Sequence, residues 1–163
     1  MTEPTTIATS AQIHTAEVGR TISMLATRHD IRRFAVAIRA MSPEHHDVDA
    51  ARALGYDDLL APAYFFATIS LSLGRVLPSD ELRPDGLAKS DDIGFPVVAG
   101  GSTVNWHRPI VAGEEIEVIE RFLGSRETSG HSGRLSLLRY KREYFANGQI
   151  AVDETLVRIG RHE

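Results

Sequence analysis

Paired histidines and acidic residues follow a proline in the stretch SPEHHD, from Ser42 to Asp47. An imidazole can take or give a proton near neutral pH, and a carboxylate beside it can orient the ring or hold a water molecule. His45, His46 and Asp47 therefore have the chemical means for acid–base work. The same groups also suggest a metal, but zinc normally takes three or four protein ligands and the sequence offers no other close set. We predict neither a metal nor another cofactor.

A further histidine of interest, His107, lies in the later half of the chain, in a stretch with the character of a β-strand (Ser102–Arg108). Alternation along that strand puts Trp106 and Arg108 on one face of a sheet and His107 on the other. Asn105 and His107 are candidate substrate-binding groups. The alternative for His107 is that it only packs against a neighbour or pairs with an acidic group.

The elements that must position these groups begin with helices. Apolar residues recur at helical spacing over Asp30–Ala40, and Thr27 can cap this helix. A shorter helix is expected over Val48–Leu54. Pro62 suits the first turn of a third helix, Ala63–Val76, which is apolar on nearly all sides and is therefore predicted to be buried. On that reading, Tyr64 belongs either to the core or to a pocket at the start of the helix.

The later half predicts an antiparallel sheet. The dipeptide Asn147-Gly148 is a strong hairpin signal, because both residues accept the positive φ of a type I′ turn. Loops are expected over Pro78–Gly101 and Gly124–Gly133, which are rich in turn-forming and polar residues. A short strand or turn is expected over Thr21–Leu25, and strands over Ser102–Arg108, Glu115–Leu123, Arg134–Phe145 and Gln149–Ile159.

Helices followed by an antiparallel sheet indicate the α+β class, with the sheet wrapped around one long central helix. The 163 residues are enough for one domain. We expect a flexible tail over residues 1–12, which are rich in Thr, Ala and Ser, and a single domain over residues 13–163.

Composition excludes several classes of function. A net charge of -4 argues against a general nucleic-acid binder, which needs a basic surface. No apolar run approaches the roughly 20 residues that span a membrane, and no signal peptide is visible. The chain has no cysteine, which removes disulfides and thiolate nucleophiles. These features predict a cytoplasmic protein.

Two blocks of the sequence resemble the MaoC-like dehydratases, and within them the small subunits of mycobacterial-type (3R)-hydroxyacyl-ACP dehydratases. The first block is IRRFAVAIRAMSPEHHDVDAARALGYDDLLAPAYF, residues 31–65. The second is VNWHRPIVAGEEIEV, residues 104–118, and TLVRIGR near the C-terminus is similar to the last strand of that family. The resemblance covers about residues 17–161.

The resemblance implies a hotdog fold, a homodimer or a heterodimer with a second hotdog subunit, and an acyl-CoA or acyl-ACP substrate. It also implies addition or removal of water at the 2,3 position of the acyl chain, as in fatty acid or polyketide metabolism. The catalytic groups carried over are His45 as the acid–base and the backbone N–H of Ala63, at the start of the central helix, as the donor to the thioester carbonyl. Tyr64, Asn105 and His107 would line the substrate site.

The sequence departs from the family pattern at one decisive position. Active members carry Asp-x-Asn-Pro-x-His, which aligns with Ala40–His45, so alanine stands where the catalytic aspartate is expected. Asp47 or Glu44 could supply that carboxylate from nearby, and Asp57 or Asp58 could supply it from the following loop. Two alternatives remain open. The chain could be a non-catalytic subunit that needs a catalytic partner, or a hotdog enzyme repurposed as a cyclase, an isomerase or a thioesterase.

Overall fold

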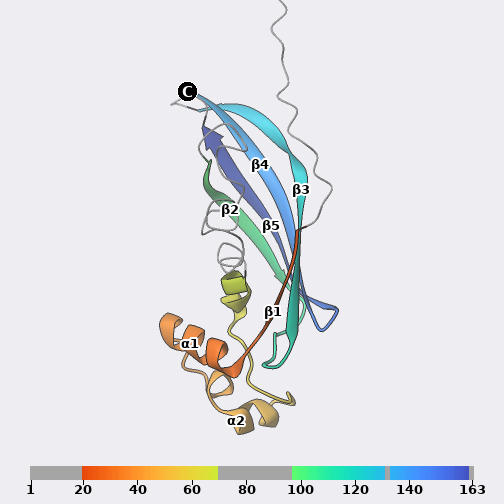
Figure 1. The fold of residues 1–163 in the computed structure, drawn as a ribbon. Helices are drawn as coiled ribbons and strands as arrows, with labels where there is room; N and C mark the ends of the chain where they lie inside the picture. Colours follow the sequence, from red (N-terminus) through yellow and green to blue (C-terminus); the bar gives the residue numbers. More distant parts are fainter. Residues whose placement is uncertain (1–19, 70–96, 131–132, 162–163) are drawn as a thin grey trace, which may run out of the picture.

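A computed structural model describes residues 20–69, 97–130 and 133–161 of the chain. These residues form a five-stranded sheet with two short α-helices at one end of it (Figure 1). The elements, in chain order, are β1 (Arg20–Leu25), α1 (Arg28–Ile38), the 3₁₀ turn η1 (Pro43–His45), α2 (Val48–Ala53), the 3₁₀ turn η2 (Ala63–Phe65), β2 (Val97–Trp106), β3 (Glu115–Gly130), β4 (Gly133–Ala146) and β5 (Gln149–Arg161).

The sheet is antiparallel throughout, with the strand order β1-β3-β4-β5-β2. The strands β4 and β5 form a hairpin across Asn147 and Gly148, whose φ angles of 48° and 76° confirm the turn that this dipeptide predicts. Among the described strands, β2 pairs only with β5 and lies at one edge of the sheet. The predicted α+β class with an antiparallel sheet is therefore confirmed.

The first helix starts as the sequence predicts and ends earlier. The hydroxyl of Thr27 accepts a hydrogen bond from the Asp30 backbone N–H at 3.1 Å and donates one to the Asp30 carboxylate at 2.6 Å. Helix α1 then ends at Ile38, because Arg39 adopts a left-handed conformation with φ 58°. A chain reversal at Arg39, ahead of Pro43, thus ends the helix.

One hydrophobic core joins the helical layer to the sheet. Ile31 on α1 belongs to it, and so do Phe65 and Phe66 together with buried residues of β4 and β5. The ring of Phe66 lies 4.9 Å from that of Tyr144, which is completely buried on β4. The segment that begins the expected central helix is therefore anchored against the sheet.

Two expected loops differ from the structure. Residues 97–101, expected in a loop, belong to β2, and residues 124–130, expected in a polar connection, continue β3. Both stretches are rich in residues that disfavour strands, and pairing with a neighbouring strand overrides that preference. The backbone is α-helical over residues 66–69, and the rest of the expected helix Ala63–Val76 lies outside the described residues, as does the expected tail 1–12.

None of the helices in the described ranges is long and apolar enough to cross a membrane.

Candidate active-site cleft

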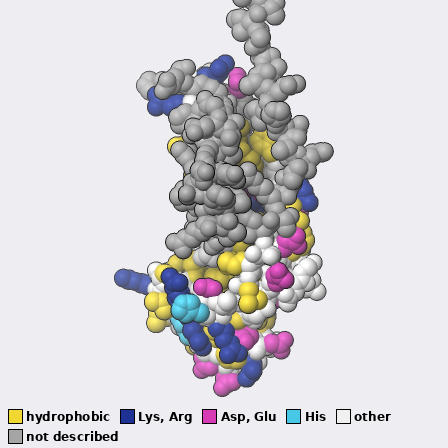
Figure 2. All heavy atoms as spheres, in the orientation of Figure 1, with side chains coloured by type: hydrophobic (Ala, Val, Ile, Leu, Met, Phe, Trp, Pro, Cys, Tyr) yellow, Lys and Arg dark blue, Asp and Glu magenta, His cyan; other side chains and the backbone are white. Residues whose placement is uncertain are grey.

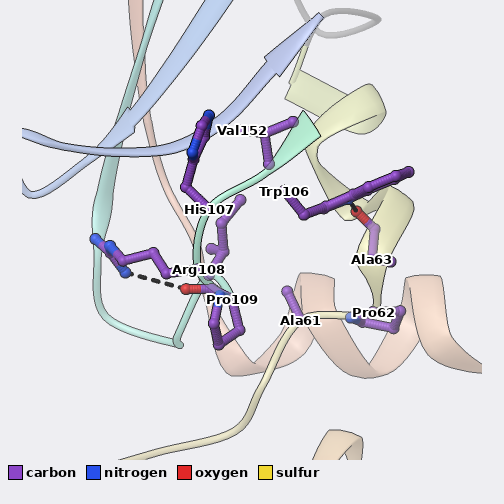
Figure 3. A pocket seen from close by; sticks show the side chains of 9 residues that line it. Ala61, Pro62, Ala63, Trp106, His107, Arg108, Pro109 and Val152 are labelled. Carbon is purple, nitrogen blue, oxygen red and sulfur yellow. Dashed lines mark hydrogen bonds between the residues drawn. The ribbon is translucent and has the colours of Figure 1, made fainter. Parts of the chain in front are cut away.

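A cleft of about 400 Å³ opens where the chain enters η2 beside the end of β2 (Figure 3). Its walls come from two segments that are far apart in sequence. The cleft is lined by Ala61, Pro62, Ala63, Trp106, His107, Arg108, Pro109, Ile110 and Val152. It therefore combines the start of the expected central helix with the end of an edge strand.

The sequence RPIVAGE builds one wall of the cleft through a turn held by charge. The guanidinium of Arg108 pairs with the Glu114 carboxylate at 2.9 Å, and that carboxylate also accepts the Val111 backbone N–H at 2.8 Å. Gly113 has a φ of +92°, which a side chain would strain. The second family-like block thus serves to fix the backbone around Pro109 and Ile110.

The start of η2 is held in place from the sheet. The indole Nε1–H of Trp106 donates to the Ala63 carbonyl at 2.9 Å, and the Ala61 N–H donates to the Ile110 carbonyl at 2.8 Å. Ala63 is the first residue of η2, where backbone N–H groups have no acceptor within the helical turn. Tyr64 is 54% exposed and packs edge-on against Trp106 at the rim. Ala63 thus lines the cleft at the start of η2, with its carbonyl held by Trp106.

The imidazole of His45 is half-buried and oriented by the backbone. Its Nδ1 lies 2.8 Å from the Leu60 carbonyl oxygen, and the Leu60 N–H donates in turn to the Glu44 carbonyl at 3.0 Å. A carbonyl can only accept, so Nδ1 carries the proton and the lone pair of the neutral ring lies on Nε2. Within the described residues this Nε2 has no hydrogen-bond partner. His45 can therefore act as a proton acceptor tied to the segment that leads into the cleft.

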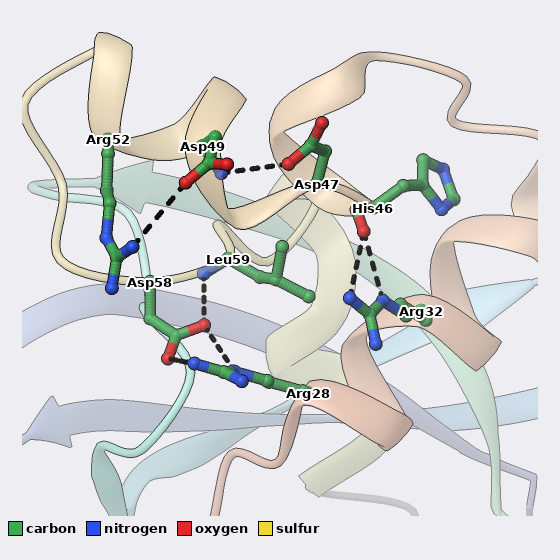
Figure 4. Close-up of polar contacts among 8 residues, drawn as sticks. All are labelled: Arg28, Arg32, His46, Asp47, Asp49, Arg52, Asp58 and Leu59. Atoms are coloured by element: carbon green, nitrogen blue, oxygen red, sulfur yellow. Dashed lines mark hydrogen bonds and ion pairs between the residues drawn. The ribbon is translucent and has the colours of Figure 1, made fainter.

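Two neighbouring carboxylates, Asp47 and Asp58, are held in structural contacts (Figure 4), and so is the ring of His46. Asp47 caps α2 by accepting the Asp49 N–H at 2.9 Å, and its side chain is exposed. The ring of His46 makes a separate contact: its Nε2–H donates to the Ala40 carbonyl at 2.8 Å. Asp58 accepts both the Arg28 guanidinium and the Leu59 N–H, which lowers its pKa. No carboxylate of the described residues is bonded to His45.

His107 pairs with an acidic group, which is the alternative weighed from the sequence. Its Nε2 lies 2.7 Å from the Asp153 carboxylate on β5, and Asn105 donates its amide to the same carboxylate at 3.2 Å. These hydrogen bonds, helped by the nearby cation of Lys141, hold the pKa of Asp153 below its ordinary value. In Figure 3 the ring of His107 lies on the opposite side of the strand end from the Trp106 ring, as alternation predicts.

The structure thus brings together some of the predicted site residues. Ala63 and His107 line the same cleft, Tyr64 stands at its rim, and His45 is bonded to the Leu60 carbonyl just before it. Asp47 instead caps a helix, and Asn105 holds Asp153. The sequence did not predict that Asp153 would hold His107 or that the Leu60 carbonyl would orient His45.

Nothing in the sequence signals the missed contacts. The pairing of His107 with Asp153 joins residues 46 positions apart, and it depends on the register of β2 against β5. A backbone carbonyl carries no sequence signature at all. In the described part of the chain, no three acidic or histidine side chains lie close enough to hold a metal ion.

The chain is similar to a known family of sequences. The model of the family described as the FAS1-like, dehydratase domain region matches residues 13–154. A UPF0336 protein of Parafrankia sp. is 32% identical over 139 residues, which cover 82% of each chain. A UPF0336 protein of Saccharopolyspora erythraea is 34% identical over 95 residues, 56% of this chain, and the match spans only 54% of that relative.

Two solved complexes from Mycobacterium tuberculosis share the fold. The ChsH1-ChsH2 complex superposes with a TM-score of 0.68 at 21% identity, covering 87% of this chain and 86% of that chain. The HadBC (3R-hydroxyacyl-ACP dehydratase) complex superposes with a TM-score of 0.64 at 20% identity, covering 87% of this chain and 96% of that chain. The α+β arrangement of the described residues thus matches that of hotdog dehydratases.

Proposed function

The chain belongs to the FAS1-like dehydratase domain family, and we propose that it acts on acyl thioesters as a hydratase or dehydratase, or as one subunit of such an enzyme. Water would be added to a 2-enoyl thioester, or removed from a 3-hydroxyacyl thioester. The acyl group would arrive on coenzyme A or on an acyl carrier protein. The observation that carries this proposal is the orientation of His45: its Nδ1–H donates to the Leu60 carbonyl, which leaves the lone pair on Nε2 to accept a proton.

Each part of the reaction has a candidate group. In hydration, His45 Nε2 takes a proton from water as the water oxygen bonds to C3 of the acyl chain. The electron pair of the double bond moves to the thioester carbonyl oxygen, which accepts the Ala63 N–H. Collapse of the enolate then takes a proton from His45 at C2, which returns the imidazole to its neutral form. The reverse sequence removes water.

The test is the hydration of a short and a long trans-2-enoyl-CoA, and the loss of the enoyl absorbance measures the rate. We expect His45→Ala to lower kcat/KM by about 10²–10⁴-fold, the usual contribution of a general acid–base group. The matched control is His46→Ala, which removes an adjacent imidazole bonded only to a backbone carbonyl and should keep activity within about threefold. Full activity of His45→Ala on every substrate that the wild type turns over would refute the proposal.

A second function is favoured by a specific observation. Ala40 stands at the position of the catalytic aspartate, and no carboxylate of the described residues is bonded to His45. Of the acidic residues near it in sequence, Asp47 caps a helix and Asp58 pairs with Arg28. The chain could therefore bind the acyl group while a second hotdog subunit supplies the aspartate–histidine pair. Both solved complexes reported above, HadBC and ChsH1-ChsH2, are named as complexes of two different chains.

The edge of the sheet supports such a partner. Strand β2 has no charged residue along VVAGGSTVNW and is exposed over most of its length, although edge strands usually carry charges that block pairing. On the second proposal, the folded chain alone gives no turnover, and activity appears when a hotdog chain with an intact Asp-x-Asn-Pro-x-His motif is added and co-purifies with it. An active, stable homodimer would contradict the second proposal.

A further inference from the structure

The outward face of α1 combines cations with exposed apolar side chains. His29, Arg32, Arg33 and Val36 recur at helical spacing and line a shallow groove of about 420 Å³ with Ala37. Figure 2 shows basic and histidine side chains gathered over α1, while acidic side chains gather over α2 below it. The groove is thus a separate surface from the cleft at η2.

The positive charge of this face is largely uncompensated. Residues 28–39 contain four arginines and one aspartate, a formal charge of +3, in a chain whose net charge is -4. Arg28 is neutralised by Asp58, whereas Arg33 and Arg39 make no ion pair within the described residues. Arg32 donates twice to the His46 carbonyl, at 3.0 and 3.1 Å, which fixes the guanidinium without cancelling its charge (Figure 4).

Apolar side chains are exposed at the same end of the molecule. Val36 is 65% exposed, Ile38 50% and Met41 77%. Apolar side chains exposed beside cations are typical of a surface that binds a protein partner, because their exposure to water is unfavourable and a partner removes it. From His29 to Val36 the face extends about 10 Å along the helix, at 1.5 Å per residue. A spread of that kind fits the side of a partner helix better than a single phosphate group, which needs converging donors.

The face lies next to the candidate active site. Helix α1 packs on η2 through the rings of Phe34 and Phe65, whose centroids are 5.8 Å apart. Figure 3 shows α1 running beneath Ala61 and Pro62, two residues that line the cleft. A protein docked on α1 would therefore sit beside the start of η2.

We propose that this face of α1 is the docking surface for an acidic acyl carrier protein, which would present its thioester arm to the cleft beside it. The inference rests on the proposed action on acyl thioesters and names the carrier. Charge complementarity provides the recognition: the cations on α1 attract an acidic helix, and Val36 on the same face contacts an apolar side chain of that helix.

The test measures binding of a purified acidic holo acyl carrier protein to the full chain, together with turnover of enoyl-CoA. We expect Arg33→Glu to weaken carrier binding about tenfold, and wild-type binding to weaken as salt rises. Val36→Ser should weaken binding with no change in the salt dependence. Arg52→Glu is the matched control, because that arginine is exposed on α2 and pairs with Asp49, and it should bind as the wild type does.

The outcomes separate this inference from the proposed function. Carrier binding that falls in Arg33→Glu while enoyl-CoA turnover stays within about twofold supports the docking surface. An equal loss with enoyl-CoA would assign the cations to the nucleotide of coenzyme A and overturn the inference. Carrier binding that no α1 variant changes, or a change of oligomeric state in Arg33→Glu, would also overturn it. If His45→Ala kept full turnover of enoyl-CoA while carrier binding still depended on Arg33, the proposed chemistry alone would be refuted.

Discussion

His45 and His107 lie in two regions of the molecule that hold a histidine by different means. His45, in the helical layer before the cleft, is oriented by a backbone carbonyl, and His107, at the end of β2, is oriented by the Asp153 carboxylate. A carbonyl fixes the ring and its tautomer without adding charge. A carboxylate adds a charge and, here, ties two strands together. On the proposed function, His45 transfers the proton in the helical layer, whereas His107 stabilises the β2–β5 end of the sheet.

The strongest way to sharpen this division is to restore the missing acid. Ala40→Asp places a carboxylate five residues before His45, where the family motif has one. We expect hydration of enoyl-CoA to rise by about 10²-fold, because a positioned carboxylate can hold the water that His45 deprotonates. The measurement is kcat/KM at constant protein concentration.

Two further variants decide how that result is interpreted. Met41→Asp adds the same charge one residue later, on a side chain that is 77% exposed, and should leave activity unchanged. Adding His45→Ala to Ala40→Asp should abolish the gain. A gain that survives without His45, or that Met41→Asp reproduces, would break the assignment of chemistry to the helical layer.

The β2–β5 end can be tested by two adjacent glycines. A methyl group on Gly100 would lie 2.8 Å from the Val157 carbonyl oxygen on β5, whereas one on Gly101 would meet nothing within 4 Å. We expect Gly100→Ala to lower the free energy of unfolding by about 1–3 kcal/mol, because backbone cannot yield as a flexible side chain can. Gly101→Ala should stay within about 0.5 kcal/mol of the wild type.

Urea unfolding measures both glycine variants, and enoyl-CoA turnover below the transition should be unchanged in each. Equal stabilities for the two variants would show that this part of the β2–β5 ladder is not tightly held. Loss of turnover in a folded Gly100→Ala protein would connect the sheet edge to the chemistry and weaken the comparison.

Local signals in the sequence were sufficient for the elements that depend on neighbouring residues. Thr27 and Asp30 form a cap and Asn147-Gly148 forms a turn, as their types predict. The extension of β3 to Gly130 could not be found in this way, because its residues are in a strand only through pairing with β4. The sequence shows which side chains can do chemistry, and the register of distant strands decides which of them meet.

The candidate site was predictable to the same extent as the fold: its local motif was visible in the sequence, and its long-range contacts were not. The stretch around His45 was recognisable as a candidate because proline, histidine and acid are adjacent in sequence. The Leu60 carbonyl that orients His45 is 15 residues away, and Asp153 is 46 residues from His107. Both contacts exist only after β2 and the segment before η2 are packed in place.

The smallest expected effect concerns Asp153 and pH. Hydrogen bonds from His107 and Asn105 lower the folded-state pKa of this carboxylate below its ordinary 3.8. The ionised carboxylate therefore stabilises the fold at pH above its unfolded pKa, and this contribution is lost as the pH falls through the lowered value. We expect Asp153→Asn to cost about 1–2 kcal/mol of unfolding free energy at pH 7, a typical value for charged hydrogen bonds. The difference from the wild type should shrink below about pH 4.

The matched control for this pH dependence is Asp49→Asn, whose side chain is 90% exposed and contacts only Arg52 at 3.5 Å. Its unfolding free energy should follow that of the wild type across the same range, because an exposed ion pair contributes little. Asp153→Asn should also leave enoyl-CoA turnover within about threefold, since the carboxylate holds His107 and not His45. A large loss of turnover with little change in stability would reverse the roles of the two histidines and make His107 the proton carrier.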